Sequence, residues 1–220
     1  KKMTYKNKAS IGIALDGDAD RVIFSDEQGK LIGGDQIIGV LAKHMKSTNQ
    51  LNNNTVVGTI MTNLSLEQYL DTLGIRLKRV NVGDRYILDE MINNDFSLGG
   101  EPSGHVLLTD HSKTGDGLLT AIKIISLLKK SGQKASEFLR PFKMTPYKIK
   151  NIEKIDNKIL NNTKIKNKIN DLNKQLSNNG RILVRSSGTE QLTRILVESR
   201  QKSIIDKYLK KICEILQSKD

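Results

Sequence analysis

Short apolar runs alternate with amphipathic segments along the first two thirds of the chain. The apolar runs have the length of buried strands, and we expect strands at 11–15, 22–24, 55–60, 75–82, 96–98 and 106–108. Between several of these strands, apolar residues recur with helical spacing. We therefore expect helices at 35–41, 64–73, 86–91 and 118–130, the first capped by Asp35. Strands that alternate with helices predict an α/β domain.

The pattern changes near residues 140–146, where two of the three prolines fall. Beyond this point the sequence predicts a Lys/Asn-rich helix at 156–176, strands at 182–184 and 192–197, and a last helix with apolar positions from 204 to 216. We therefore expect a second, smaller domain. The chain starts with Lys1, and apolar residues begin at Ile11, so we also expect it to be a piece of a longer protein.

Composition narrows the functional classes. No apolar run approaches the ~20 residues of a membrane helix, and no secretory signal is present, so a soluble cytoplasmic protein without a membrane partner is expected. The single cysteine, Cys213, excludes an internal disulfide. The net charge of +12 comes largely from Lys mixed with Asn and Ile, with few aromatic residues, which argues against nucleic-acid binding.

Three carboxylates occupy alternate positions of the loop after the first predicted strand. Asp16, Asp18 and Asp20 are separated only by Gly17 and Ala19, and such small residues let the backbone fold so that three oxygens converge. Carboxylate oxygens favour Mg²⁺ or a similar cation. The loop therefore predicts a metal site at the carboxyl end of a buried strand, with an acidic surface turn as the alternative.

An EF-hand loop is the other metal-binding alternative, because Asp16, Asp18, Asp20 and Glu27 match its positions 1, 3, 5 and 12. Arg21 stands where that loop needs glycine, and the flanking segments read as strands rather than helices. These two features exclude an EF-hand.

A glycine-rich loop at 99–105 carries side chains suited to a sugar. Glu101 can accept hydrogen bonds from neighbouring hydroxyls, and Ser103 adds a small donor and acceptor. His105 titrates near neutrality and could transfer a proton, or could be a structural histidine bonded to a carbonyl.

A third loop has the composition of a phosphate site. Two arginines, Arg185 and Arg194, flank the small polar residues Ser187, Gly188 and Thr189. Guanidinium forks, hydroxyls and successive backbone N–H groups suit a phosphate dianion. The segment lacks the Gly-Lys-Ser/Thr ending of a Walker loop.

Together these loops resemble those of the α-D-phosphohexomutase superfamily. The family patterns Asp-Gly-Asp-x-Asp-Arg, Gly-Glu-x-Ser-Gly-His and Arg-x-Ser-Gly-Thr-Glu fall, in family order, on 16–21, 100–105 and 185–190. Segments 82–86 and 114–117 are similar to the branch that acts on glucosamine phosphates. Ser186 and Gln191 depart from the common family residues, but neither departure removes a ligating group.

The resemblance implies a domain arrangement. Residues 1–30 would end the second family domain, 31–143 would form the third, a mixed-sheet αβα domain, and 144–220 would form a smaller α+β domain that binds phosphate. The family's first domain, with its phosphorylatable serine, would be absent from this sequence. The remaining domains of the enzyme would then be partners of this chain, which alone would be inactive.

The resemblance also implies an isomerase that interconverts glucosamine 6-phosphate and glucosamine 1-phosphate through a phosphoserine and a bisphosphate, toward UDP-N-acetylglucosamine. One Mg²⁺ would bind the three aspartates. The implied catalytic and substrate-binding residues are Arg21, Asp84, Arg85, Glu101, Ser103 and His105. The alternatives are a phosphomannomutase or phosphoglucomutase, and a non-catalytic sugar-phosphate-binding fragment.

Overall fold

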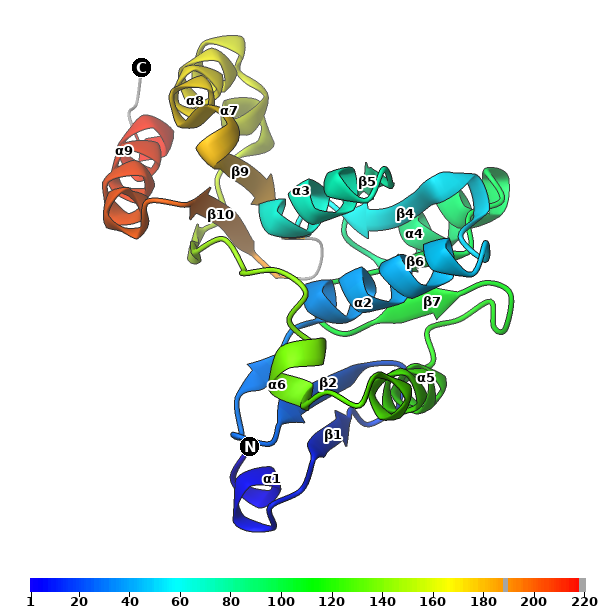
Figure 1. The fold of residues 1–220 in the computed structure, drawn as a ribbon. Coiled ribbons are helices and arrows are strands. Elements are labelled where there is room, and N and C mark those ends of the chain that lie inside the picture. Colours follow the sequence, from blue (N-terminus) through cyan, green and yellow to red (C-terminus); the bar gives the residue numbers. More distant parts are fainter. Residues whose placement is uncertain (188–189, 218–220) are drawn as a thin grey trace. The chain divides into compact units, whose positions relative to one another are not determined.

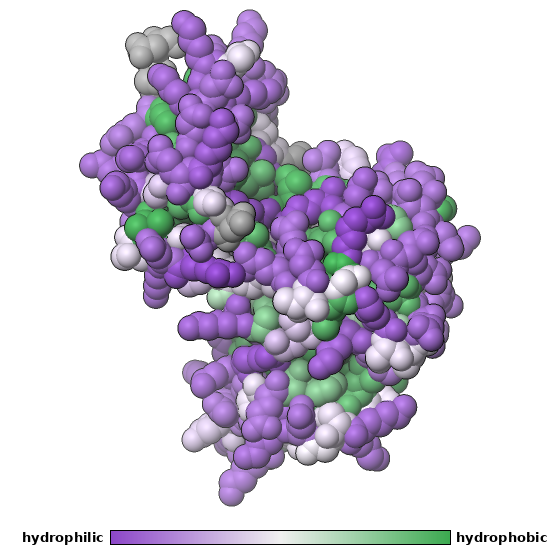
Figure 2. All heavy atoms as spheres, turned by 45° about the horizontal axis from the view of Figure 1, so that its top comes forward, coloured by the Kyte–Doolittle hydropathy of each residue, from purple (hydrophilic) through white to green (hydrophobic). Residues whose placement is uncertain are grey.

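The computed structural model describes residues 1–187 and 190–217, and the chain divides into two compact units, Lys1–Lys143 and Met144–Asp220. Figure 2 shows hydrophilic residues over most of the visible surface. Among the described residues, no helix combines the length and apolar character needed to cross a bilayer. The assignment of residues 1–30 to the end of a separate, second family domain stays a prediction.

Unit 1 contains two sheets. The first is antiparallel and has the order β1 (Ile11–Leu15), β2 (Val22–Asp26), β3 (Leu31–Ile32). The second has the order β5 (Arg76–Val80), β4 (Thr55–Thr59), β6 (Leu98–Gly100), β7 (Val106–Leu108). Strand β4 is parallel to β5 and β6, while β7 is antiparallel to β6, so the predicted mixed sheet is confirmed.

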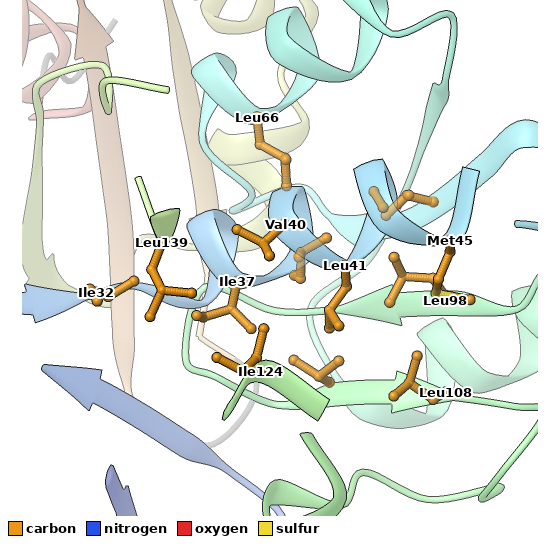
Figure 3. Close-up of a cluster of buried hydrophobic side chains, with 14 of the residues drawn as sticks. Ile32, Ile37, Val40, Leu41, Met45, Leu66, Leu98, Leu108, Ile124 and Leu139 are labelled. Carbon is orange, nitrogen blue, oxygen red and sulfur yellow. The ribbon is translucent and has the colours of Figure 1, made fainter. Parts of the chain in front are cut away.

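Helices cover both faces of the four-stranded sheet. Val56 of β4 packs in the cluster that includes α2 (Gly34–Ser47) and α3 (Leu64–Thr72), whereas the next residue, Val57, packs with α4 (Asp84–Asn93). Successive strand residues point to opposite faces, so both faces need apolar cover. Figure 3 shows α2 at the centre of the larger cluster, between Leu66 of α3 and Leu108 of β7.

Two further helices complete unit 1. Helix α5 (Gly117–Ser131) supplies Ala121, Ile124 and Leu128 to the larger cluster, and α6 (Ala135–Phe138) follows it. Figure 1 shows both beside β1 and β2, and the short α1 (Lys2–Lys6) lies before β1. Helix α5 begins where Asp116 caps it, its side chain accepting a hydrogen bond from Leu119 N at 2.8 Å.

The predicted cap of α2 is wrong. Helix α2 begins at Gly34 with Gly33 as its N-cap, and Asp35 lies inside the first turn. The Asp35 side chain is buried and accepts a hydrogen bond from Asn63 N at 3.1 Å. A tertiary partner thus takes the oxygen that would otherwise cap the helix.

The prediction that the first strand is buried is also wrong. Strand β1 forms a hairpin with β2, and Ile13 and Leu15 are 42% and 41% exposed. In β2, Val22 and Phe24 face the core, while Ile23 is exposed. Ile13 and Leu15 lie opposite Phe24 and Val22, but β1 is the edge strand of the sheet, and the larger core cluster includes Val22 and Phe24 and neither Ile13 nor Leu15.

Unit 2 is an antiparallel sheet with helices packed against it. Its strand order is β8 (Tyr147–Glu153), β10 (Leu192–Ser199), β9 (Gly180–Ser186). Helices α7 (Asn157–Asn161), α8 (Thr163–Leu176) and α9 (Ile205–Gln217) share a core with Ile182 and Ile195 of the sheet. The expected single helix at 156–176 is therefore two helices. Short 3-10 turns lie at Asn52–Asn54, Ser177–Asn179 and Lys202–Ile204.

A buried ion pair joins the two ends of unit 1. Asp26 is fully buried; its carboxylate pairs with the Arg140 guanidinium and accepts hydrogen bonds from Gln28 N at 3.0 Å and Lys30 N at 2.8 Å. Arg140 also donates to Leu31 O at 3.1 Å. The pair therefore connects β2 with the segment after α6.

We expect Arg140→Met to lower the free energy of unfolding by about 3–5 kcal/mol, because it leaves a buried carboxylate without its cation. Arg85→Met is the matched control, since the Arg85–Asp89 pair is exposed and should contribute under ~0.5 kcal/mol. Urea unfolding of both variants and of Asp26→Asn/Arg140→Met measures this. Equal losses in Arg140→Met and Arg85→Met would contradict the assignment, and the double variant should recover part of the loss.

Candidate functional site

The three aspartates lie in the loop that connects β1 to β2. One carboxylate oxygen from each of Asp16, Asp18 and Asp20 lies within 4.8 Å of the others. Contacts within the loop fix its conformation. Arg21 N donates to Asp16 Oδ1 at 3.1 Å, and Ala19 adopts a left-handed φ of 59°. The arrangement offers a compact set of hard oxygen ligands, which suits a divalent cation such as Mg²⁺.

Charge repulsion in this loop is only partly compensated. Arg21 Nε is 3.8 Å from Asp16 Oδ2 and 3.9 Å from Asp20 Oδ1, and its side chain is half exposed. Burial, then hydrogen bonding with Asp16 and the charges of Asp16 and Asp18, raises the pKa of Asp20, with His105 opposing this shift. A bound cation would remove the repulsion that raises this pKa.

The Glu101–His105 loop, between β6 and β7, docks directly onto the metal loop. Val22 N donates to Gly104 O at 3.1 Å, and Arg21 and His105 form a β-bridge. Gly104 has a φ of 92°, and a Cβ there would lie 2.2 Å from Val22 O. Only glycine permits this approach, so the structure brings the two predicted loops together.

The Glu101 carboxylate is held between two neighbours. Its Oε1 accepts a hydrogen bond from Gly83 N at 3.2 Å, and its Oε2 accepts one from Ser103 Oγ at 3.3 Å. Gly83 precedes α4, so Asp84 and Arg85 begin that helix beside the Glu101 loop. Arg85 is largely exposed and pairs with Asp89 at 3.6 Å. The Glu101 carboxylate and the Ser103 hydroxyl thus lie together, next to the start of α4.

His105 lies beneath the metal loop. It is 4% exposed, and its Nδ1 lies 3.1 Å from Asp20 Oδ2. A Cβ at Gly115 would lie 2.2 Å from His105 Cε1, so the ring is covered on that side. Its Nε2 is buried and has no hydrogen-bond partner among the described residues. This geometry suits a residue that orients Asp20; a role in proton transfer stays a prediction.

Two glycines behind the metal loop were not expected to form part of the site. Gly117 N donates to Ala19 O at 2.9 Å, and a Cβ at Gly117 would lie 2.8 Å from both Ala19 O and Arg21 O. Gly115 packs against His105. The signal in the sequence was the pair of glycines around the helix-capping Asp116, but no local pattern says that they contact a loop about 100 residues earlier.

The predicted phosphate-binding residues lie in unit 2, at the connection between β9 and β10. Arg185 and Arg194 are directly opposite in the antiparallel register, so both side chains point to one face of the sheet. Like charges in this position repel unless an anion lies between them. Glu190 pairs with Arg194 at 2.5 Å, and Glu190 N donates to Ser187 Oγ at 3.3 Å. The predicted Gly188 and Thr189 lie outside the described residues.

Sequence-family comparison matches residues 33–144 to "Phosphoglucomutase/phosphomannomutase, alpha/beta/alpha domain III" and residues 146–215 to the C-terminal domain of the same family. A phosphoglucosamine mutase of Agrobacterium fabrum is 41% identical over 217 residues, which cover 99% of this chain and 48% of the relative. One of Listeria monocytogenes is 42% identical over 212 residues, covering 96% and 47%. The chain thus spans about half the length of these curated relatives.

Solved structures agree on the fold. A phosphoglucomutase/phosphomannomutase family protein of Burkholderia thailandensis superposes with a TM-score of 0.84 at 18% identity, over 99% of this chain and 49% of that one. The N-acetylphosphoglucosamine mutase of Aspergillus fumigatus, in complex with GlcNAc-6P and magnesium, gives 0.78 at 19% identity, over 93% and 48%. With both family domains matched in order and relatives above 40% identity, this chain belongs to the phosphoglucomutase/phosphomannomutase family of phosphohexomutases.

Proposed function

We propose that this chain carries the metal-, sugar- and phosphate-binding loops of a phosphoglucosamine mutase that interconverts glucosamine 6-phosphate and glucosamine 1-phosphate. The observation that carries the proposal is the backbone hydrogen bond between the acidic hairpin loop and the Glu101 loop. This contact holds the proposed metal ligands next to the loop that carries the proposed sugar-binding carboxylate. The relatives above 40% identity bear that name, which supports the glucosamine substrate.

In this proposal each loop has a separate task. Asp16, Asp18 and Asp20 hold Mg²⁺, and the bound ion would neutralise charge on the phosphoryl group in transfer. His105 keeps Asp20 in its ligand position. The phosphoryl group itself is carried by a serine outside this chain, through a bisphosphate, so the chain alone would bind substrate without converting it.

Substrate binding falls to the other side chains. Glu101 and Ser103 accept and donate hydrogen bonds to the sugar hydroxyls, and Asp84 and Arg85 lie beside them. The proposed phosphate-binding residues, Arg185, Ser187, Gly188, Thr189 and Arg194, hold the phosphate that is not reacting. Such fixed contacts orient a sugar that must react at either end.

The metal assignment is tested with Asp18→Asn. We expect Mg²⁺ or Mn²⁺ affinity, measured by calorimetry, to fall about tenfold or more, because affinity of oxygen-ligand sites depends on the number of charged ligands. Asp71→Asn, at an exposed position of α3, is the control and should bind metal as the unsubstituted chain does. Because the pKa of Asp20 is raised, affinity should begin to fall, as pH decreases, above the ordinary aspartate range near ~3.9. Unchanged binding in Asp18→Asn would exclude the site.

The phosphate assignment is tested with Arg185→Gln and Arg194→Gln in the longer protein that supplies the remaining domains. Each should weaken phosphosugar binding by one to two decades, the equivalent of ~1.5–3 kcal/mol for a charge-assisted hydrogen bond. The Arg194–Glu190 pair is partly exposed, so we expect its loss to lower the thermal stability only slightly. Lys210→Gln, at an exposed position of α9, is the control. Wild-type affinity in both arginine variants would refute the assignment.

Substrate preference separates the proposal from the nearest alternative, a phosphoglucomutase or phosphomannomutase. A C2 ammonium near Glu101 or Asp84 should gain more than a hydroxyl would, by about 1–3 kcal/mol, or one to two decades in kcat/KM. The measurement compares glucosamine, glucose and mannose phosphates in the longer protein, with the 220-residue chain as a zero-turnover baseline. A ratio that favours glucose or mannose would assign the protein to the other branch.

A further inference from the structure

A pocket of about 260 Å³ lies in unit 1 between α2, α5 and the turn after β7. Its polar lining comprises His44, Gln50, Asp110, His111, Lys123, Ser126 and Lys130. Its apolar lining includes Met45, near the C-terminal end of α2, and Leu108, in β7, both labelled in Figure 3. None of these residues belongs to the loops described above.

The pocket lies at the other end of α2 from the sugar loop. Gly34, at the start of α2, donates its N–H to Pro102 O at 3.3 Å, whereas His44 is ten residues further along the helix. At 1.5 Å per residue this separation is about 15 Å. Helix α5 likewise begins at the metal loop, where Gly117 N bonds Ala19 O, and supplies the pocket only from Lys123 onward.

The basic side chains are placed to act together. Lys123, Ser126 and Lys130 are spaced by three and seven residues, so they share one face of α5. Among the described residues, neither lysine takes part in an ion pair, and Asp110, the one carboxylate in the pocket lining, has none either. Positive charge therefore exceeds negative charge in the pocket.

The pKa of His44 responds to this excess of positive charge. Burial, followed by the charges of Lys130 and Lys123, lowers the pKa of His44, which places both ammonium groups within electrostatic reach of the ring. His111 and Asp110 face the same space from the turn after β7. An anion bound here would reverse the effect, because it would stabilise the protonated imidazole.

We propose that this pocket binds the phosphoryl dianion of a small phosphorylated ligand, at a second site separate from the metal and sugar loops. Lysine ammonium groups are compact point charges that bind phosphate, and imidazole and hydroxyl groups add donors. The lining includes no Tyr, Phe or Trp on which a base could stack, and the volume is small for a nucleotide. The proposal uses none of the residues on which the proposed mutase function depends.

Histidine NMR tests the site directly, because the chain has only three histidines, His44, His105 and His111. Inorganic phosphate is titrated against the 220-residue chain at constant ionic strength, with His44→Gln and His111→Gln to assign the signals. We expect the His44 and His111 ring signals to move together and saturably, the pKa of His44 to rise, and His105 to stay unmoved. Movement of His105 alone, or of none, would overturn the proposal.

Matched lysine variants identify the contacts. Lys123→Gln/Lys130→Gln should weaken phosphate binding at least about tenfold, whereas Lys129→Gln, on the same helix but outside the pocket lining, should leave it unchanged. Repeating the titration with glucosamine 6-phosphate distinguishes the source: tighter binding at the same two histidines indicates a phosphate ester, and equal binding indicates inorganic phosphate. An unaltered response in the double variant would overturn the proposal.

Discussion

The metal loop depends on two backbone hydrogen bonds from segments about 80 and 100 residues away in sequence. Val22 N donates to Gly104 O at one end of the loop, and Gly117 N donates to Ala19 O in its middle. Both contacts need glycine, since a Cβ at either position would lie under 3 Å from a carbonyl oxygen. The carboxylates, the Glu101 loop and the start of α5 are therefore positioned by one another, and a shift in one would move all three.

Both proposed ligand sites bring side chains of like charge close together. In unit 1, burial and then the neighbouring Asp16 and Asp18 raise the pKa of Asp20, and a half-exposed Arg21 lies beside the loop. In unit 2, Arg185 and Arg194 lie opposite each other on neighbouring strands. Repulsion between like charges at such short distances lowers stability, and a bound ligand of opposite charge would relieve it. This cost favours ligand sites over surface turns.

The acidic loop, the Glu101 loop and the arginine-flanked loop could be recognised as candidates from sequence, because each is one continuous segment whose residue types suggest a kind of ligand. The apolar runs predicted an α/β domain for the same reason, whereas the mixed-sheet αβα arrangement came from the family resemblance. Contacts between distant segments could not be predicted: His105 meets Asp20 across 85 residues, and no local pattern encodes that distance. The burial of β1 and the cap of α2 failed for a related cause, because covered faces and the Asp35–Asn63 contact are tertiary properties. Strand β8 was missed: Tyr147 and Ile149 alternate with lysines there, but the Lys- and Asn-rich sequence continues beyond the strand and hides this short alternation.

The three aspartates alone supply too few ligands for a complete Mg²⁺ site. Mg²⁺ requires near-octahedral coordination, and three carboxylates supply only about half of the six positions if each gives one oxygen. Water or a group from outside the described residues must fill the rest. The chain spans about half the length of its curated relatives, so there is room for that group in the other half. If these three carboxylates hold Mg²⁺ as proposed, strong metal binding would depend on ligands that they do not supply themselves.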